Sequence, residues 1–191
     1  MRKVTISMLM SILYLFSASI YALNAKGVEI PEVVTQDGSQ QELVLNGTGV
    51  RGKFIFDIYV GALYLVKPSD DAIQIMSDSS PKRVMMHFLY NEISENKMHS
   101  AWREGFEDNL DDVEYAEIEE EIDKFNSAFG DTVKDDVVVI DFLPDSTTRV
   151  KINCSQKVII ESPGFQRALL SIWLGDSPID SSLKSGLLGR Q

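Results

Sequence analysis

The chain has 191 residues, a formal net charge of −11 and a single cysteine. Nucleic-acid binding requires clusters of Lys and Arg, so this charge argues against a nucleic-acid partner and against an anionic membrane surface. One cysteine excludes an internal disulfide bond. Cys154 lies between Ile152 and Val158, which predicts a small buried thiol in or beside a hairpin.

The first 25 residues have the pattern of a secretory signal peptide. Two basic residues precede an uncharged apolar run over 4–18, and Ala22 and Ala25 are candidate cleavage ends. We therefore expect residues 1–25 to be removed, residues 26–191 to form one domain, and the mature chain to be periplasmic or secreted. The apolar run is short for a membrane span, although an uncleaved anchor remains an alternative, and no stable membrane insertion is expected.

Apolar patterns of period two predict the strands that follow the leader. In chain order, the predicted strands are residues 28–34, 43–45, 54–65, 83–90, 137–143, 149–153 and 157–161. Pro31 places the first of them at a sheet edge, because proline cannot donate to a ladder. The last two strands alternate well enough to form an antiparallel hairpin.

Apolar residues spaced by three and four predict the helices, and their ends carry capping signals. The predicted helices are a short turn at 72–76, a helix capped by Ser94 that carries Trp102 and Phe106, a helix with an apolar stripe over 118–129 that ends at Gly130, a helix that begins at Ser162-Pro163 and ends at Gly175, and a short last helix capped by Asp180. Strands that follow one another without an intervening helix pair antiparallel. The predicted fold is therefore α+β, an antiparallel sheet with a layer of helices on one face.

Residues 43–65 contain the best candidate for a binding group. Two β-rich runs flank Gly47, Gly49 and Gly52, which predict a turn or bulge, and Arg51 lies beside them. A guanidinium at the mouth of such a hairpin can bind a carboxylate through two hydrogen bonds. The alternative is an Arg that caps a turn and points into water.

Aromatic residues complete this candidate site. Tyr59 offers an O–H donor on the same segment as Arg51, and a concave sheet covered by helices with Trp and Phe can leave an apolar cavity. The predicted ligand-binding residues are Arg51, Tyr59, Tyr64, Trp102 and Phe106. The alternative for Tyr59, Tyr64 and Tyr90 is an ordinary place at the edge of the core.

Signatures of known catalytic and cofactor sites are missing from the sequence. There is no nucleophile elbow, phosphate-binding loop or dinucleotide fingerprint, and the only histidines, His87 and His99, have no partner at metal-ligand spacing. We therefore predict no metal site, no cofactor and no catalytic residue. Axial haem ligation by a histidine or a methionine remains an alternative.

Three separate motifs resemble the chalcone isomerase-like family, in particular its bacterial exported branch. They are Gly-Val-Arg-Gly at 49–52 with Ala-Leu-Tyr-Leu at 62–65, Ala-Trp-Arg-Glu-Gly-Phe at 101–106, and the segment 168–178 with Gly-Leu-Leu-Gly at 186–189. The resemblance covers residues 27–189 in the expected order. It implies an open-faced β-sandwich, in agreement with the predicted fold.

The resemblance also bears on function. In the plant isomerases, the Arg that matches Arg51 holds the substrate, and a Tyr and an Asn act with it; Ile93 and Ser100 occupy those positions here. The Thr that the plant enzymes carry in the long strand falls near Ile58 or Tyr59. Members that bind fatty acids use an Arg and a Tyr, an arrangement that Arg51 and Tyr59 resemble.

These observations lead to three hypotheses. The first is a non-catalytic periplasmic protein that binds an amphipathic carboxylate such as a fatty acid in an apolar pocket. The second is an isomerase, an intramolecular lyase of the chalcone isomerase type acting on a phenolic substrate. The third is a scaffold or assembly factor of the cell envelope that binds a protein partner through the acidic run 117–121. The sequence leaves the oligomeric state open.

Overall fold

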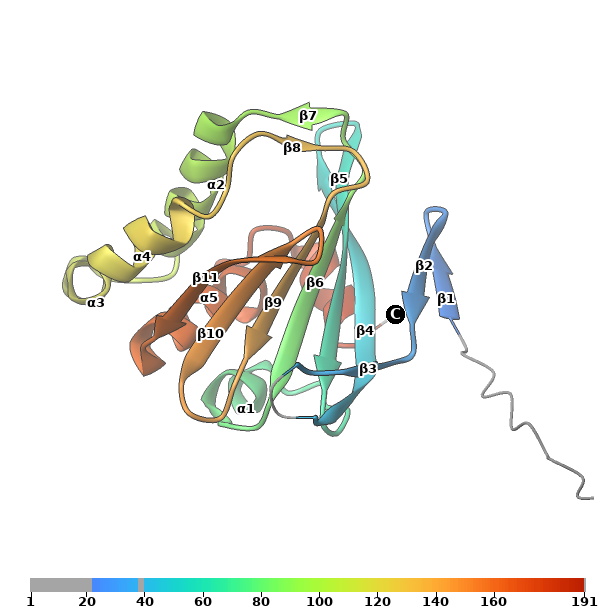
Figure 1. Ribbon diagram of the computed structural model, residues 1–191, viewed down its shortest axis with the longest axis horizontal. Helices are drawn as coiled ribbons and strands as arrows, with labels where there is room; N and C mark the ends of the chain where they lie inside the picture. Colours follow the sequence, from blue (N-terminus) through green and yellow to red (C-terminus); the bar gives the residue numbers. More distant parts are fainter. Residues whose placement is uncertain (1–21, 38–39, 191) are drawn as a thin grey trace, which may run out of the picture.

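A seven-stranded antiparallel sheet forms the centre of the molecule (Figure 1). The computed structural model describes residues 22–37 and 40–190. The order of strands across the sheet is β11-β10-β9-β6-β5-β4-β3. These strands are β3 (Val33–Thr35), β4 (Glu42–Lys53), β5 (Phe56–Leu65), β6 (Lys82–Phe88), β9 (Val137–Phe142), β10 (Thr147–Ile152) and β11 (Ser155–Glu161).

Two short antiparallel ribbons accompany the sheet. Strand β1 (Ala22–Ala25) pairs with β2 (Val28–Pro31), and β7 (Glu92–Ile93) pairs with β8 (Thr132–Val133). The predicted leader lies outside the described residues, except for its last four residues, which form β1. Within the described part of the chain, no helix is long and apolar enough to cross a membrane.

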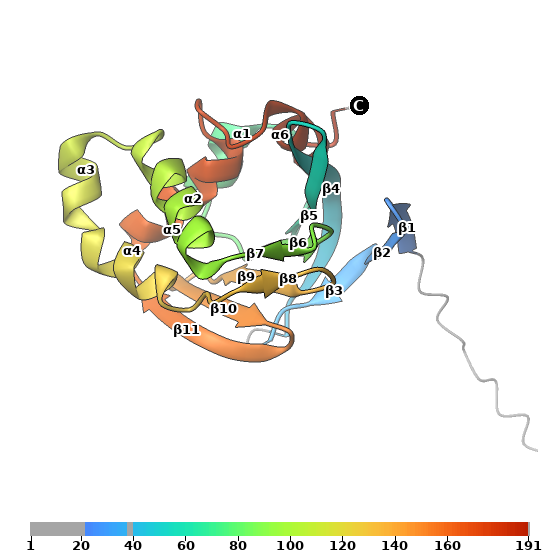
Figure 2. The same cartoon turned by 90° about the horizontal axis from the view of Figure 1, so that it is seen from above.

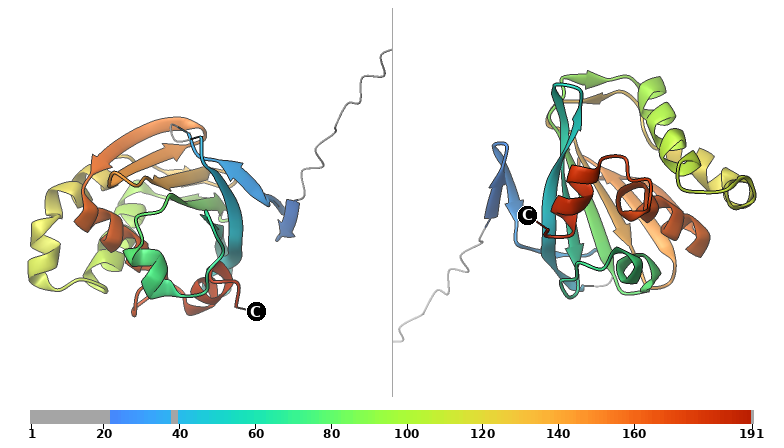
Figure 3. Two further views of the ribbon diagram at one scale, coloured as in Figure 1. Left: turned by 90° about the horizontal axis from the view of Figure 1, so that it is seen from below. Right: turned by 180° about the vertical axis from the view of Figure 1, so that it is seen from behind.

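The sheet curls, and helices fill its concave side (Figure 2). The helices are α1 (Ala72–Ser77), α2 (Glu95–Glu107), α3 (Asp112–Glu117), α4 (Glu119–Asn126), α5 (Pro163–Leu174) and α6 (Ser181–Leu187). Helix α5 lies against the sheet with α2 and α4 beside it, and α6 packs on β4 and β5 (Figure 3). The α+β fold, an antiparallel sheet with helices, is confirmed.

Strand β5 is buried on both faces because the helices pack on one face and strand β2 packs on the other. Successive side chains of a strand point to opposite faces. Tyr59 and Leu63 therefore join the large core beneath the helices. Val60, Ala62 and Tyr64 join a second core on the other face, where they meet Val28 and Ile30 of β2.

The predicted glycine-rich turn is wrong in position. Gly47, Gly49 and Gly52 all lie within β4, and the β4–β5 turn consists of Phe54 and Ile55. Part of the glycine pattern reflects close packing, since a Cβ on Gly47 would lie 2.2 Å from the carbonyl oxygen of Gly186. The bulge expectation holds, because the β4–β5 register shifts between Leu45 and Gly47 and again between Arg51 and Gly52.

Other local predictions need correction. The strand expected over 28–34 is two strands, β2 and β3, and the helix expected over 118–129 ends at Asn126 with Ser127, not Gly130, as its C-cap. Cys154 is exposed, because it lies in the β10–β11 turn with φ +66° rather than in the core. The caps predicted at Ser94, Ser162 and Asp180 are confirmed as N-cap positions, and Gly175 ends α5.

Candidate functional site

Arg51 and Tyr59 lie directly opposite each other on β4 and β5. The register shift between Arg51 and Gly52 leaves Ile58 as an extra residue, because Gly52 pairs with Asp57 while Arg51 pairs with Tyr59. Residues directly opposite in a sheet share a face. The bulge therefore brings both side chains to the helix side, near the end of the hairpin.

The phenol of Tyr59 is buried and fixed in orientation. Its side chain is 2% exposed, and its hydroxyl oxygen accepts a hydrogen bond of 3.0 Å from Nε1 of Trp173. Burial raises the pKa of Tyr59, against a smaller opposite effect of Arg51. The phenol therefore stays protonated at neutral pH, and its hydrogen is available for an acceptor.

Arg51 is half-buried and forms no ion pair with any carboxylate in the described part of the chain. Its Cζ lies 5.7 Å from the centroid of the Tyr59 ring, a cation–π distance. Asp180, the acid that acts electrostatically on Tyr59, is engaged elsewhere, since it accepts hydrogen bonds from the backbone N–H groups of Gly52 and Leu183.

A groove of about 590 Å³ begins at Arg51 and runs between the β4–β5 hairpin and the first turns of α2. Its apolar lining is Phe54, Phe56, Ile58, Tyr90, Ile93 and Ala101. Its polar rim is Lys53, Glu92, Asn96, Lys97, Ser100 and Glu104. This volume lies in the range typical of small-molecule sites, and an apolar lining beside polar and charged side chains suits an amphipathic ligand.

A small void of about 30 Å³ lies deeper than the groove. Both spaces are lined by Arg51, Ile93 and Ala101. The void is also lined by Tyr59 and Trp102, which do not line the groove. The volume is close to one water molecule's share of the liquid. Nε1 of Trp102 is buried and has no acceptor among the described residues. Three side chains with polar hydrogens, those of Arg51, Tyr59 and Trp102, thus surround one small space.

The structure brings together three of the five predicted site residues. Arg51, Tyr59 and Trp102 meet at the void. Phe106 packs deeper, against the rings of Phe125 and Phe165 at 6.3 and 5.8 Å between centroids, and lines neither space. Tyr64 lies on the opposite face of the sheet, in the second core.

Sequence reasoning missed much of the groove wall. Phe54 lies in the β4–β5 turn, Phe56 follows the turn, and Tyr90 follows β6; Phe56 and Tyr90 form an edge-on contact of 5.4 Å between centroids. The available signal was the pair of phenylalanines at 54 and 56, whose meaning became visible only once the turn was placed at 54–55. Ile93 and Ser100, the positions of the plant Tyr and Asn, both line the groove.

The side chains that could bind a metal ion are dispersed in the described part of the chain. No group of three or more His, Cys, Asp or Glu side chains within the described ranges could hold a metal ion. Nε2 of His87 lies 3.3 Å from Asp135, and Nε2 of His99 lies 3.0 Å from the carbonyl oxygen of Phe129. Both histidines thus have protein partners, and neither lines the groove or the void.

A curled antiparallel sheet with a groove at the end of its longest hairpin defines an α+β protein with a candidate small-molecule site. The sequence pattern of the chalcone isomerase-like family matches residues 22–189, so the chain belongs to this family. A search of curated protein sequences finds no match.

A solved structure shares the fold. The fatty-acid binding protein AtFAP1 of Arabidopsis thaliana superimposes with a TM-score of 0.72 at 14% sequence identity, over 88% of this chain and 96% of that chain. At this level of identity, the similarity concerns the fold.

Proposed function

We propose that this chain is a non-catalytic binding protein for an amphipathic carboxylate such as a fatty acid. The observation that carries the proposal is Arg51, a half-buried guanidinium without an acidic partner in the described chain, at the inner end of an apolar groove. A cation that has lost part of its hydration gains stability from a compensating anion. The carboxylate of a ligand supplies one at this position.

Different residues of the site bind the carboxylate and the hydrocarbon chain of such a ligand. The guanidinium of Arg51 donates to the carboxylate, in the charge-assisted geometry that Arg forms with planar anions. Tyr59 donates its hydroxyl hydrogen, while Trp173 holds the phenol oxygen in place. The hydrocarbon chain lies over Phe56, Ile58 and the other apolar groove residues, and water leaves that surface.

The groove favours binding over isomerase chemistry. Of the two positions that act with Arg in the plant isomerases, Ile93 has no donor group, and the hydroxyl of Ser100 donates to the carbonyl oxygen of Asn96 at 2.8 Å. Stabilising an oxyanion in a transition state takes several donors placed in advance. The fatty-acid binding described for AtFAP1, which shares the fold, supports the same choice.

The proposal places the protein in the periplasm, because the first residues resemble a secretory leader. The pairing of strand β1 distinguishes the two candidate cleavage sites. Cleavage after Ala25 would remove β1, which pairs along its whole length with β2, whereas cleavage after Ala22 retains three of its residues. We therefore favour Ala22 as the end of the leader.

Native mass spectrometry of the mature protein, purified from the periplasm and then mixed with oleate, tests the proposal. The wild type should carry a carboxylate adduct that Arg51→Ala loses. Arg103→Ala is the matched control, because Arg103 pairs with Tyr115 and Asp123 on the surface and should keep the adduct. Bare polypeptide in the wild type with added oleate, or equal adducts in all three proteins, would contradict the proposal.

A further inference from the structure

The β4–β5 turn exposes two large apolar side chains in succession. Phe54 is 96% exposed and Ile55 is 89% exposed, the highest values among the exposed large hydrophobic residues of the described chain. The next residue, Phe56, is 50% exposed. Single exposed apolar residues need no explanation, but a run of three at a projecting turn indicates a contact with another apolar phase.

The backbone of this turn is strained. Phe54 has φ +57°, a left-handed conformation that bulky residues rarely adopt and that glycine adopts freely. A glycine at this position would remove both the strain and the exposed ring. A phenylalanine in this conformation is consistent with a role for the exposed side chain.

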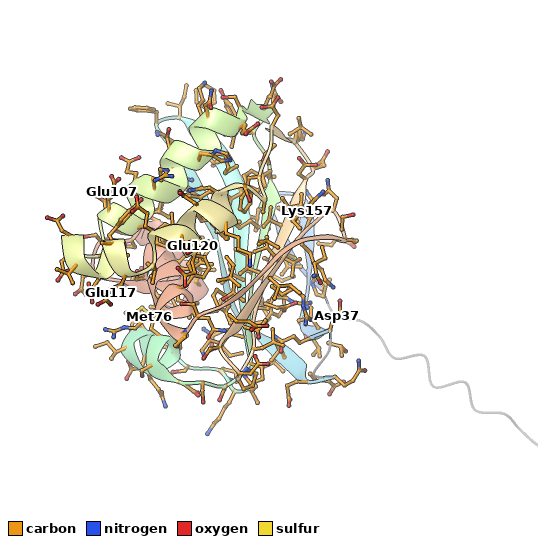
Figure 4. The ribbon with its side chains drawn as sticks, turned by 60° about the vertical axis from the view of Figure 1, so that its left-hand side comes forward. Asp37, Met76, Glu107, Glu117, Glu120 and Lys157 are labelled. Atoms are coloured by element: carbon orange, nitrogen blue, oxygen red, sulfur yellow. The ribbon has the colours of Figure 1, made fainter. Side chains whose placement is uncertain are left out.

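The charge around the turn is mixed, because the groove beside it carries Lys53 and Lys97 together with Glu92 and Glu104. Residues 104–123 contain 11 of the 29 acidic residues and no Lys or Arg; without the leader, which holds Arg2 and Lys3, the other 18 acids face 16 basic residues. Figure 4 shows Glu107, Glu117 and Glu120 of this segment on the helices at one side of the molecule. The turn itself lies at the top of the view in Figure 1, with the exposed Lys53 before it and the exposed Lys97 across the groove.

We propose that the β4–β5 turn is a membrane-contact element that places Phe54 and Ile55 in the interfacial layer of a lipid bilayer. Lys53 and Lys97 then face the lipid phosphates, which attract juxtamembrane basic residues. Most of the acidic segment, residues 107–123, lies outside the groove lining, so the acidic side of the molecule can face away from the bilayer in this orientation. The contact is peripheral and involves no spanning segment.

A bilayer fits this surface better than a protein partner does. Specific protein interfaces bury more than about 1,000 Å² with complementary shape, and a two-residue turn offers far less. A bilayer needs no complementary shape, and its interface accepts apolar side chains beside basic ones. Phe54 and Phe56 also line the groove, so the contact would open the groove toward the phase in which fatty acids reside. This last step alone rests on the proposed function.

Vesicle binding tests the contact directly. Co-sedimentation with vesicles of phosphatidylethanolamine and phosphatidylglycerol in a 3:1 ratio should give binding that Ile55→Ser weakens about tenfold or more, as the transfer of one such side chain implies. Ile73→Ser is the matched control, because Ile73 is 76% exposed on α1, at the bottom of Figure 1. Equal binding of the wild type and Ile55→Ser, or absence of wild-type binding, would overturn the proposal.

Fluorescence locates the turn in the bilayer. In an Ile55→Trp variant, brominated lipids should quench the new indole, whereas the native Trp102 and Trp173 are buried and provide an unquenched background. An unquenched indole would also overturn the proposal.

Oleate titration separates this proposal from the proposed function. Ile55 does not line the groove, so Ile55→Ser should bind oleate in detergent-free buffer as the wild type does. Vesicle binding without any oleate affinity would sink the proposed function and leave the membrane contact standing. Oleate affinity without vesicle binding would do the reverse.

Discussion

Strand β5 takes part in two arginine–tyrosine pairs, one on each face of the sheet. Arg51 of β4 lies opposite Tyr59, and Arg83 of β6 lies opposite Tyr64. Arg83 has an internal partner, since its Nε and Nη2 donate to the two oxygens of Asp141 at 2.7 and 2.9 Å. Arg51 has no carboxylate partner within the described residues.

Register explains the difference between the two pairs. Asp141 of β9 lies directly opposite Arg83 and is fully buried, so the sheet itself supplies the anion. On the other face, the strand next to Arg51 presents Tyr59, and beyond the hairpin end lies the groove. The same residue type therefore stabilises the fold in one place and remains available for a ligand in the other.

Replacing Asp141 by asparagine should have the largest effect on stability. Asp141→Asn leaves the guanidinium of Arg83 without its anion in a buried site, which costs about 3–5 kcal/mol of the free energy of unfolding. Arg51→Leu removes no ion pair of the described chain and should change this free energy by less than about 1 kcal/mol. Urea unfolding of both variants measures the contrast.

A supporting control is Asp123→Asn, which breaks an exposed ion pair with Arg103 and should cost well under 1 kcal/mol. If Arg51→Leu destabilised the protein as much as Asp141→Asn, Arg51 would be a structural residue and the comparison would fail.

Tyr59→Phe should weaken ligand binding and also lower the free energy of unfolding, the latter by less than Asp141→Asn does. Loss of a hydroxyl donor to a charged acceptor should weaken oleate binding by about tenfold or more. The same change leaves Nε1 of Trp173 without its acceptor, which should lower the free energy of unfolding by about 1 kcal/mol. Calorimetric titration and urea unfolding measure the two effects.

Tyr90→Phe is the matched control for that experiment. Tyr90 lines the groove but not the void, and its ring contact with Phe56 does not use the hydroxyl. We expect oleate affinity close to the wild type. A Tyr59→Phe variant that binds oleate as tightly as Tyr90→Phe would remove Tyr59 from the site.

Local sequence signals predicted much of the fold. The β10–β11 hairpin follows from alternation, and α5 follows from Ser162-Pro163 at one end and Gly175 at the other. These features depend on neighbours in the chain, where propensity and capping act. The glycines predicted a turn or bulge beside Arg51, but the direct pairing of Arg51 with Tyr59 depends on the extra residue Ile58 in β5, whose position no local pattern fixes.

Contacts between distant segments explain what the sequence did not show. Gly47 predicted a turn, but its neighbour in space is Gly186, almost 140 residues later, where α6 crosses β4. The position of Tyr64 on the other face of the sheet, in contrast, could have been predicted from the sequence. It lies five residues after Tyr59, and an odd separation in a regular strand places two side chains on opposite faces.

Tyr64→Phe should give the smallest effect at neutral pH and a distinct one in alkali. The Tyr64 hydroxyl is buried and has no partner among the described residues, so its removal should change the free energy of unfolding by less than about 1 kcal/mol, toward greater stability. Burial raises the pKa of Tyr64 to about 12, from 10.0. Between these two values the unfolded chain releases a proton that the folded chain retains, so wild-type stability falls as pH rises. Urea unfolding at pH 8 and pH 11 should show a smaller decline for Tyr64→Phe than for the wild type. Identical declines would mean that the hydroxyl on this face is solvated, and that the second core is not closed around it as the first is around Tyr59.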